Sequence, residues 1–248
     1  MKKIFLILIA VGIISLKVFA SEPSDNIYKE VIIDDNLTES SAMKKEVPET
    51  FLEDKISEIN SIQNNEEKIK AWAKFNYIKN YIIINKKNCE ATIYDKDGNE
   101  IKSFEIGIGK EIGDDFNDTK GLLGKPKNTT PAGEYTLIAN VFNKSAYGDL
   151  TLSLGGKANK VRDNKKVVAL HKVPKFREKD RLKLFHDGNL SNNRMSHGCI
   201  NFLEEDFKEL TKYIQGGGKL YVLPEEPDNE LKLIKNDKNK YELAQTKY

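Results

Sequence analysis

The sequence predicts a mainly β fold with one helix packed on it, preceded by short N-terminal helices. Runs of alternating apolar and polar residues, separated by turn residues, recur through residues 79–224 and are typical of strands. One segment after residue 203 has acidic residues at its start and glycines at its end, the pattern of a single helix. With 248 residues, 39% of them hydrophobic, the chain can bury one sizeable core and carry flanking segments.

The residues before this domain divide into a spacer and a helical lead-in. Residues 21–50 are polar and lack sustained periodicity, which predicts a flexible spacer. In the lead-in, 51–78, apolar residues such as Ile56 and Ile59 recur at helical spacing. Trp72 lies on the same apolar stripe. It could stack on a sugar, but an aromatic residue in such a stripe more often packs against a neighbouring domain.

Within the domain, the turn Asp97-Gly98 between two alternating runs predicts a β-hairpin. We expect Cys89, just before the second strand, to be a small buried filler. The loop 110–130 ends in TPAGEY (130–135), a turn that leads into another strand. The tail, 225–248, is charged and weakly patterned, and we expect no catalytic role for it. The expected strands span 81–85, 91–94, 101–108, 135–141, 150–154, 167–170 and 220–223, and the expected helix spans 204–214.

Residues 1–20 have the pattern of a secretory signal. Lys2 and Lys3 precede an apolar run, and Val18-Phe19-Ala20 is a small-x-small cleavage site. The apolar run is shorter than the roughly 20 residues of a membrane span, which favours cleavage over an uncleaved anchor. In either case we expect export to the periplasm or cell envelope, with membrane contact only through this segment if it is uncleaved.

The charge balance argues against a nucleic-acid partner. Removal of the signal takes away three lysines and no acid, so the 40 basic residues become 37 against 38 acidic residues. Nucleic-acid binding concentrates positive charge on one face, whereas lysines and acids are interspersed along this chain.

The histidines and one cysteine are concentrated in a single stretch. All three histidines, His171, His186 and His197, lie in the interval that ends at Cys199. A disulfide with Cys89 or a zinc site are the alternatives, but a chain of this size needs no disulfide and the ligand spacing is irregular. A thiol beside a neutral imidazole suffices for acyl transfer, because the imidazole takes the thiol proton and returns one to a leaving amine.

The residue before the cysteine adds to this interpretation. Gly198 permits a tight backbone turn, which we expect to aim the amide N–H groups of Gly198 and Cys199 at an oxyanion. Such donors would stabilise the charge that develops when the sulfur adds to a carbonyl.

Several ordered elements resemble one family. MSHGCINF at 195–202 is similar to the signature of the L,D-transpeptidases, whose catalytic domain is of the YkuD type. TPAGEY at 130–135 and ALH at 169–171 occupy the positions of further elements of that family. The long interval between this histidine and the cysteine motif resembles the branch that carries an insertion. The resemblance covers residues 81–223 approximately and implies an L,D-transpeptidase-like β-sandwich.

The resemblance also implies roles for individual residues. Cys199 matches the acylated nucleophile, His171 the residue that activates it, and His197 a second histidine that lines the site. The remaining motif positions match residues that shape the loop, Ser196, Gly198 and Asn201, and an arginine that holds a substrate carboxylate, Arg194.

Two departures from the family pattern affect these roles. His186 also lies upstream of the cysteine and is an alternative base, although His171 is favoured because it directly follows the apolar strand VVAL. Asn201 stands where many relatives carry arginine, so the substrate contacts at this position could differ.

The function implied by the resemblance is acyl transfer on peptidoglycan stem peptides. Cys199 would form a thioester with a tetrapeptide and release its terminal D-alanine, and an amine would then take the acyl group. Water as the acceptor would make the protein an L,D-carboxypeptidase. We expect no metal or organic cofactor, and the sequence does not indicate an oligomeric state.

Two further alternatives are less favoured. Other cell-wall thiol hydrolases place the cysteine before its histidine, whereas all three histidines here come first. A non-catalytic wall-binding protein on the same scaffold would be expected to have lost Cys199, which is present.

Overall fold

The computed structural model describes residues 49–114, 128–140, 151–154, 168–214, 218–236 and 238–247. All of them belong to one compact unit, Asp35–Tyr248. The expected signal segment, nearly all of the spacer and most of the loop 110–130 lie outside the described residues. Among the helices that the structure describes, none has the length and apolar character needed to cross a membrane.

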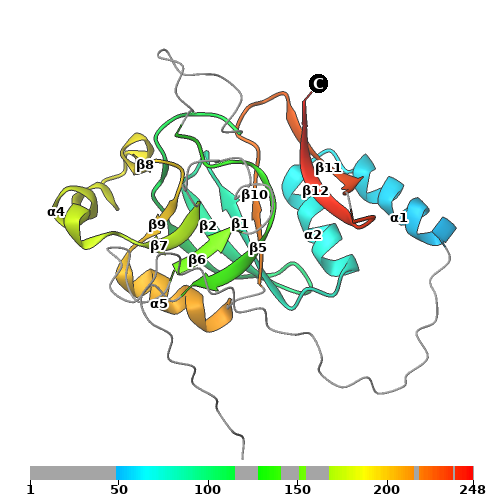
Figure 1. Ribbon diagram of the computed structural model, residues 1–248, viewed down its shortest axis with the longest axis horizontal. Helices are drawn as coiled ribbons and strands as arrows, with labels where there is room; N and C mark the ends of the chain where they lie inside the picture. The colour runs from blue at the N-terminus through cyan, green and yellow to red at the C-terminus, as the bar shows by residue number, and fades with distance from the viewer. Residues whose placement is uncertain are drawn as a thin grey trace, which may run out of the picture. The chain divides into compact units, whose positions relative to one another are not determined.

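The centre of the fold is an eight-stranded sheet with the order β3-β2-β1-β10-β5-β6-β7-β9 (Figure 1). The strand β10 is the last of these eight in the sequence, and it lies between β1 and β5, parallel to β1 and antiparallel to β5. The strands of this sheet are β1 (Asn80–Asn85), β2 (Glu90–Asp95), β3 (Glu100–Glu105), β5 (Gly133–Asn140), β6 (Thr151–Leu154), β7 (Ala169–Lys172), β9 (Ile200–Phe202) and β10 (Lys219–Val222).

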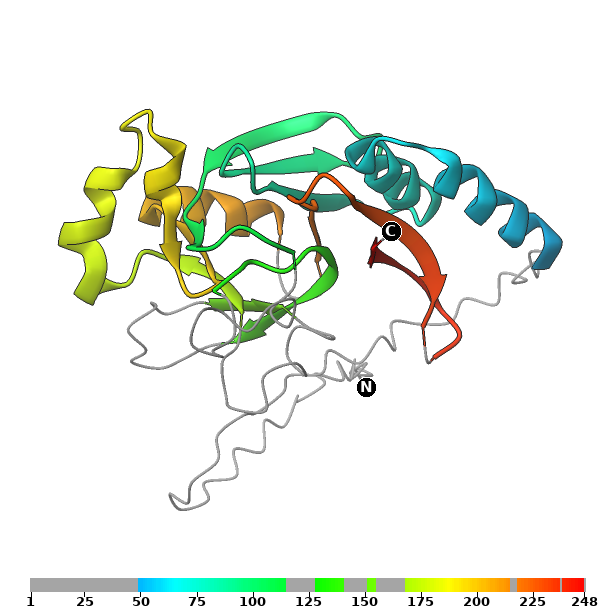
Figure 2. The same cartoon turned by 90° about the horizontal axis from the view of Figure 1, so that it is seen from above.

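Two small sheets accompany it. The strand β4 (Ile108–Gly109) pairs in parallel with β8 (Arg194–Ser196), just before the cysteine motif. The strands β11 (Asn229–Lys235) and β12 (Tyr241–Lys247) form an antiparallel hairpin. This hairpin lies beside the two N-terminal helices (Figure 2).

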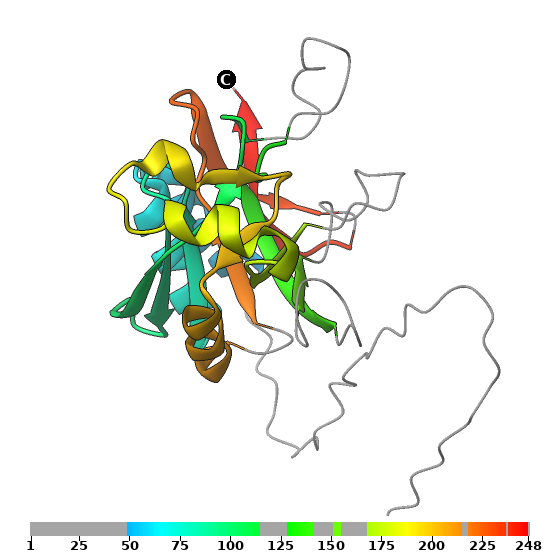
Figure 3. The same cartoon turned by 90° about the vertical axis from the view of Figure 1, so that its left-hand side faces the viewer.

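Three longer helices flank the sheets: α1 (Glu49–Ser61), α2 (Asn65–Phe75) and α5 (Glu204–Tyr213). The α2 helix begins where the Asn64 side chain caps two backbone N–H groups. The α5 helix carries three acidic residues in its first turn and Lys212 in its last, as its dipole favours. The insertion between β7 and β8 contains α4 (Glu178–Arg181) and three short 3-10 turns, at 175–177, 182–184 and 190–193 (Figure 3).

Successive side chains of a strand point to opposite faces of the sheet, and in the central strand β1 the side chains on both faces are apolar and buried. On one face, Ile82 and Ile84 of β1 share a core with Phe207 and Leu210 of α5. On the other face, Tyr81 and Ile83 pack in a second core. The second core also contains Ile59 of α1, Trp72 of α2, and Leu231, Leu233 and Leu243 of the hairpin.

The predicted architecture is confirmed: the fold is mainly β, short helices precede it, and one helix follows the cysteine motif. Trp72 packs as favoured, and its indole Nε1 donates to the Glu134 carboxylate at 3.0 Å. Cys89 is buried in the first core.

Two expectations need correction. The single strand expected at 101–108 is two strands, β3 and β4, because the chain turns at Gly107 to exchange backbone hydrogen bonds with Asn201. The tail 225–248 is not weakly patterned but contains the hairpin. Its alternation was obscured because lysines and acids occupy the outward positions between the buried leucines.

Candidate active site

The strands β7 and β9 bring two of the predicted residues onto neighbouring segments. They pair in parallel, and their register places His171 opposite Asn201, two residues beyond Cys199. Cys199 is half-buried and directly precedes β9, whereas His171 is only 2% exposed. The sheet therefore carries the predicted base and the predicted nucleophile on adjacent segments.

The imidazole of His171 has a defined tautomer. Its Nδ1 lies 2.7 Å from the backbone carbonyl oxygen of Lys172, and a carbonyl only accepts, so Nδ1 carries the hydrogen. The basic lone pair is then on Nε2. Burial lowers the pKa of His171 from 6.5 to about 4, with a contribution from the nearby Arg181 guanidinium and opposition from the Lys172 carbonyl. The ring is thus neutral at ordinary pH and able to accept a proton.

The other two histidines are exposed. His197 lies on the turn between β8 and β9, immediately before Gly198. The His186 side chain is 65% exposed, and its Nδ1 lies 2.6 Å from the Glu105 carboxylate at the end of β3. The backbone N–H of His186 also donates to this carboxylate, at 2.9 Å. His186 is thus exposed and engaged by Glu105, whereas His171 is buried on the strand beside the cysteine segment.

The Ser196–Cys199 turn is held by hydrogen bonds within itself. The Ser196 hydroxyl donates to the Cys199 carbonyl oxygen at 2.6 Å and accepts from the Gly198 N–H at 3.0 Å. Gly198 has φ +118°, a conformation that residues with a Cβ rarely adopt. The expectation for this residue is corrected: the Gly198 N–H is engaged by Ser196 and is not aimed at an oxyanion.

The TPAGEY element contacts the same turn. The Thr130 hydroxyl donates to the Gly198 carbonyl oxygen at 3.1 Å and accepts from the Gly109 N–H at 3.0 Å. A side chain at Gly109 would collide with the backbone of 128–130, which explains the glycine in β4. Two residues that are 68 positions apart in the chain, Thr130 and Gly198, thus meet beside the cysteine.

Asn201 is fully buried and is contacted by a residue that sequence reasoning did not single out. Arg181 of α4 donates to the Asn201 side-chain oxygen and, at 3.0 Å, to the Met195 carbonyl oxygen. A guanidinium therefore lies beside this motif position, although it comes from the insertion. The sequence carries no spacing signal for Arg181, because the insertion is irregular.

Arg194 lies at the start of β8, and its guanidinium is engaged within the protein. It forms an ion pair with Glu225, and both side chains are largely buried. Its Nη1 also lies 3.5 Å from the Glu111 carbonyl oxygen. The Arg194 guanidinium, which the resemblance predicts to bind a substrate carboxylate, is thus bound to the carboxylate of Glu225. Glu225, the first residue of the tail 225–248, therefore contacts a predicted site residue.

The disulfide and metal alternatives were also checked. Cys89 and Cys199 are not joined by a disulfide. Within the part of the chain that the structure describes, no group of three or more histidine, cysteine, aspartate or glutamate side chains could hold a metal ion.

Comparisons with known proteins place the chain in a family. The family model for the L,D-transpeptidase catalytic domain (YkuD) matches residues 79–222. A search of the curated proteins found no match. Among solved structures, Bd1075 from Bdellovibrio bacteriovorus is 18% identical, with a TM-score of 0.39, over 60% of this chain and 49% of that chain.

Two further structures are similar to the chain. The helical cell shape determining protein Pgp2 from Campylobacter jejuni is 17% identical, with a TM-score of 0.39, over 63% of this chain and 56% of that chain. An L,D-transpeptidase from Mycobacterium smegmatis is 16% identical, with a TM-score of 0.37, over 58% of each chain. The matched regions span between 49% and 58% of the lengths of these three structures. Because the family model covers more than half of the sequence, the chain belongs to the L,D-transpeptidase (YkuD) family.

Proposed function

We propose that this protein is a peptidoglycan L,D-transpeptidase that works through a thioester on Cys199. The observation that carries the proposal is the buried, neutral His171, whose Nδ1–H is held by the Lys172 carbonyl on the strand beside the cysteine segment. That bond fixes Nε2 as the basic nitrogen, which is the arrangement a general base for a thiol requires.

The proposed reaction begins at the carbonyl of the third residue of a stem tetrapeptide. His171 Nε2 takes the Cys199 proton, the sulfur adds to the carbonyl carbon, and the oxygen becomes an oxyanion near the Cys199 N–H. Collapse of this intermediate breaks the C–N bond, and His171 returns the proton to the leaving D-alanine amine. A thioester remains on Cys199.

The second half of the reaction reverses these proton transfers. The amine of a second stem peptide adds to the thioester, loses its proton to His171, and expels the thiolate, which is then reprotonated. Burial keeps His171 neutral before the reaction and makes its imidazolium a stronger acid, which favours return of the proton to the leaving amine. His197, exposed beside the turn, would line the substrate entrance.

Peptidoglycan lies outside the cytoplasmic membrane, which agrees with the signal pattern of residues 1–20. We therefore propose that the protein is exported to the periplasm or cell envelope. Stem peptides are its proposed partners, and no step of this chemistry needs a metal or an organic cofactor.

Incubation of the mature protein with tetrapeptide-containing wall fragments tests the proposal. We expect an intact-mass increase equal to the donor peptide without D-alanine, and no increase in Cys199→Ala. Adding an amine acceptor distinguishes the two outcomes of the thioester: a new cross-linked product indicates transpeptidation, and a tripeptide alone indicates carboxypeptidation. The absence of both adduct and D-alanine release would refute the enzymatic function.

A further inference from the structure

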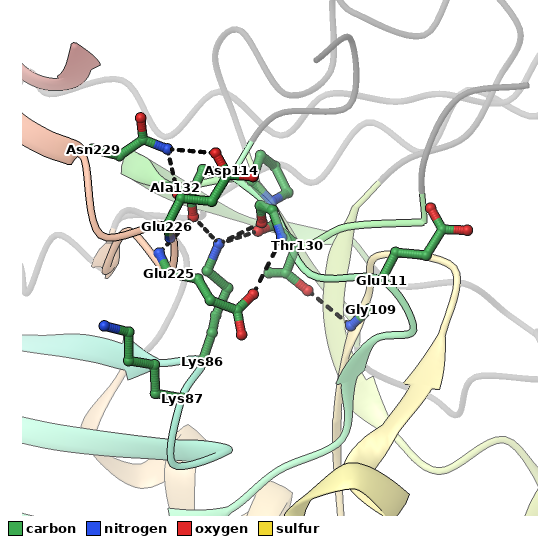
Figure 4. Close-up of polar contacts among 12 residues, drawn as sticks. Lys86, Lys87, Gly109, Glu111, Asp114, Thr130, Ala132, Glu225, Glu226 and Asn229 are labelled. Carbon is green, nitrogen blue, oxygen red and sulfur yellow. Dashed lines mark hydrogen bonds and ion pairs between the residues drawn. The ribbon is translucent and has the colours of Figure 1, made fainter. Parts of the chain in front are cut away.

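A buried ion pair lies behind the TPAGEY turn. The side chains of Lys86, at the end of β1, and Asp114 are almost completely buried and form an ion pair with each other. Figure 4 shows the Lys86 ammonium pointing into a cluster of oxygen atoms. Besides Asp114, the ammonium donates to the Gly113 carbonyl oxygen at 2.8 Å and the Thr130 carbonyl oxygen at 2.9 Å. All three hydrogens of the ammonium thus have acceptors.

The pair is connected to the cysteine motif through Thr130. Lys86 holds the carbonyl of this threonine, and the Thr130 hydroxyl in turn donates to the Gly198 carbonyl oxygen at 3.1 Å. Thr130 is itself buried, so water does not compete for either bond. The chain of contacts runs from a buried cation to the peptide bond that joins Gly198 to the nucleophile.

A second connection leads from the same pair to the start of the motif. The Asp114 carboxylate accepts from the Glu225 N–H at 2.7 Å and from the Glu226 N–H at 3.0 Å (Figure 4). The Glu225 side chain is the partner of Arg194, the first residue of β8. The buried pair is therefore linked to the cysteine motif on both sides of His197.

The consequence for the nucleophile follows from peptide geometry. In a planar trans peptide the C=O and the N–H point in opposite directions. Fixing the Gly198 carbonyl toward Thr130 therefore fixes the Cys199 N–H away from it. The proposed mechanism forms the oxyanion beside the Cys199 N–H, so the orientation of the Gly198–Cys199 peptide affects how well the backbone stabilises that charge.

We propose that Lys86 is a positioning residue for acylation, which acts through Thr130 to orient the Gly198–Cys199 peptide. This inference rests on the proposed thioester chemistry of Cys199. According to this proposal, the Lys86–Asp114 pair increases the rate of Cys199 acylation in addition to stabilising the fold.

The protein contains a matched control for a purely structural role. Lys68 of α2 is also completely buried, pairs with Glu230, and donates to the Leu231 carbonyl oxygen at 2.8 Å. It stabilises the second core, which contains no residue of the cysteine motif. Removing the charge of either lysine takes an ion pair from a largely buried carboxylate and destabilises the fold, although Glu230 keeps a longer contact with Lys232 at 3.6 Å. Only the loss of Lys86 should also disturb acylation.

The test compares acylation of Cys199 by a tetrapeptide donor with alkylation of the same thiol by iodoacetamide. Alkylation needs the thiolate but forms no oxyanion, so it reports on nucleophile activation alone. Lys86→Met and Thr130→Val should each slow acylation by about tenfold or more, as expected for a misdirected oxyanion donor. Alkylation and its pH profile should change by about twofold at most, a small fraction of the loss expected for a missing donor.

Three comparisons make the result decisive. Thr130→Ser keeps the hydroxyl and should recover acylation. Thr92 of β2 is buried, and its hydroxyl is hydrogen-bonded to that of Ser103 at 2.8 Å. Lys68→Met and Thr92→Val should both melt at a lower temperature yet acylate at the wild-type rate. In the double variant Lys86→Met/Thr130→Val, the loss should equal that of one single variant, because both act on the same bond.

The proposal is overturned if Thr130→Val acylates normally, if Lys86→Met behaves like Lys68→Met, or if acylation and alkylation fall together. Should Lys86→Met not fold, Thr130→Val still decides the outcome, because it leaves the buried pair intact. Failure of the wild-type protein to be acylated would count against the proposed function instead.

Discussion

The Nδ1–H of His171 donates a 2.7 Å hydrogen bond to the backbone carbonyl oxygen of Lys172. The imidazole is thus held by the carbonyl of Lys172, the last residue of β7. This hydrogen bond orients the ring and makes Nε2 the basic nitrogen. The pKa of His171, lowered by burial to about 4, agrees with a base that stays neutral until it takes the thiol proton.

Replacing each candidate base separately tests the assignment. His171→Gln should abolish acylation of Cys199, because glutamine cannot take the thiol proton. His186→Gln should retain most of the acylation rate, because that histidine is exposed and bound to Glu105. Single-turnover acylation with a tetrapeptide donor measures both. The reverse order of effects would show His186 to be the base.

The lowered pKa of His171 predicts a loss of stability in acid. The unfolded chain takes up a proton below pH 6.5, whereas the folded protein resists protonation until about pH 4. Acid therefore favours the unfolded state, and the free energy of unfolding should fall by up to about 3 kcal/mol across this range. Urea unfolding at a series of pH values measures this dependence. In His171→Gln the free energy of unfolding should fall less over this pH range than in the wild type, whereas in His186→Gln it should fall as much as in the wild type. Equal falls in the two variants would show that His171 is not the source of the pH dependence.

Ser196 holds the turn that carries the nucleophile, through the Gly198 N–H and the Cys199 carbonyl. Ser196→Ala removes both bonds and should lower stability by about 1–3 kcal/mol, because the buried backbone groups lose their partner. Acylation should slow by about tenfold or more as the turn loosens. Ser191→Ala, at an exposed turn, is the control and should change neither quantity. A Ser196→Ala protein with wild-type stability and rate would contradict this geometry.

The Arg194–Glu225 pair should be far more important for stability than an exposed ion pair. Glu225→Gln leaves a largely buried guanidinium without its carboxylate and should cost about 3–5 kcal/mol. Glu205→Gln breaks the exposed pair with Lys208 and should cost less than about 1 kcal/mol. Denaturant midpoints compare the two variants. Equal costs would show that the Arg194 guanidinium is solvated and accessible to a substrate carboxylate.

The C-terminal hairpin should stabilise the fold without taking part in catalysis. Leu231→Ala truncates a fully buried side chain of the second core and should cost about 2–5 kcal/mol. Ile234→Ala, on the exposed edge of the same strand, should cost less than about 1 kcal/mol. Thermal melting measures both, and acylation below the melting temperature should be unchanged. Similar melting temperatures for the two variants would contradict the packing of the hairpin.

Much of the sheet could be predicted, because short apolar runs between turn residues are typical of strands. The strands at 81–85 and 91–94 are such runs, and four consecutive residues of each are buried. The helix after Phe202 was predictable from the acidic residues in its first turn. Strands β8 and β9 are each three residues long, too short for any periodicity to be recognised. The hairpin β11–β12 was missed because its charged residues dominate its composition.

In the candidate site, too, some features could be predicted from the sequence and others could not. A local motif identified the stretch around Cys199, and the resemblance assigned roles to its residues. The contacts of Arg181 with Asn201 and of Lys86 with Thr130 join segments that are distant in sequence. Such contacts depend on tertiary packing, and no spacing rule reveals them.

The most direct test of the thioester mechanism is peptide mapping of the protein after brief incubation with a tetrapeptide donor. We expect the peptide containing Cys199 to carry the donor without its D-alanine, through a bond that hydroxylamine cleaves. One equivalent of D-alanine should be released in the first turnover. An adduct on Cys89 or on a histidine, or D-alanine release that persists in Cys199→Ala, would contradict it.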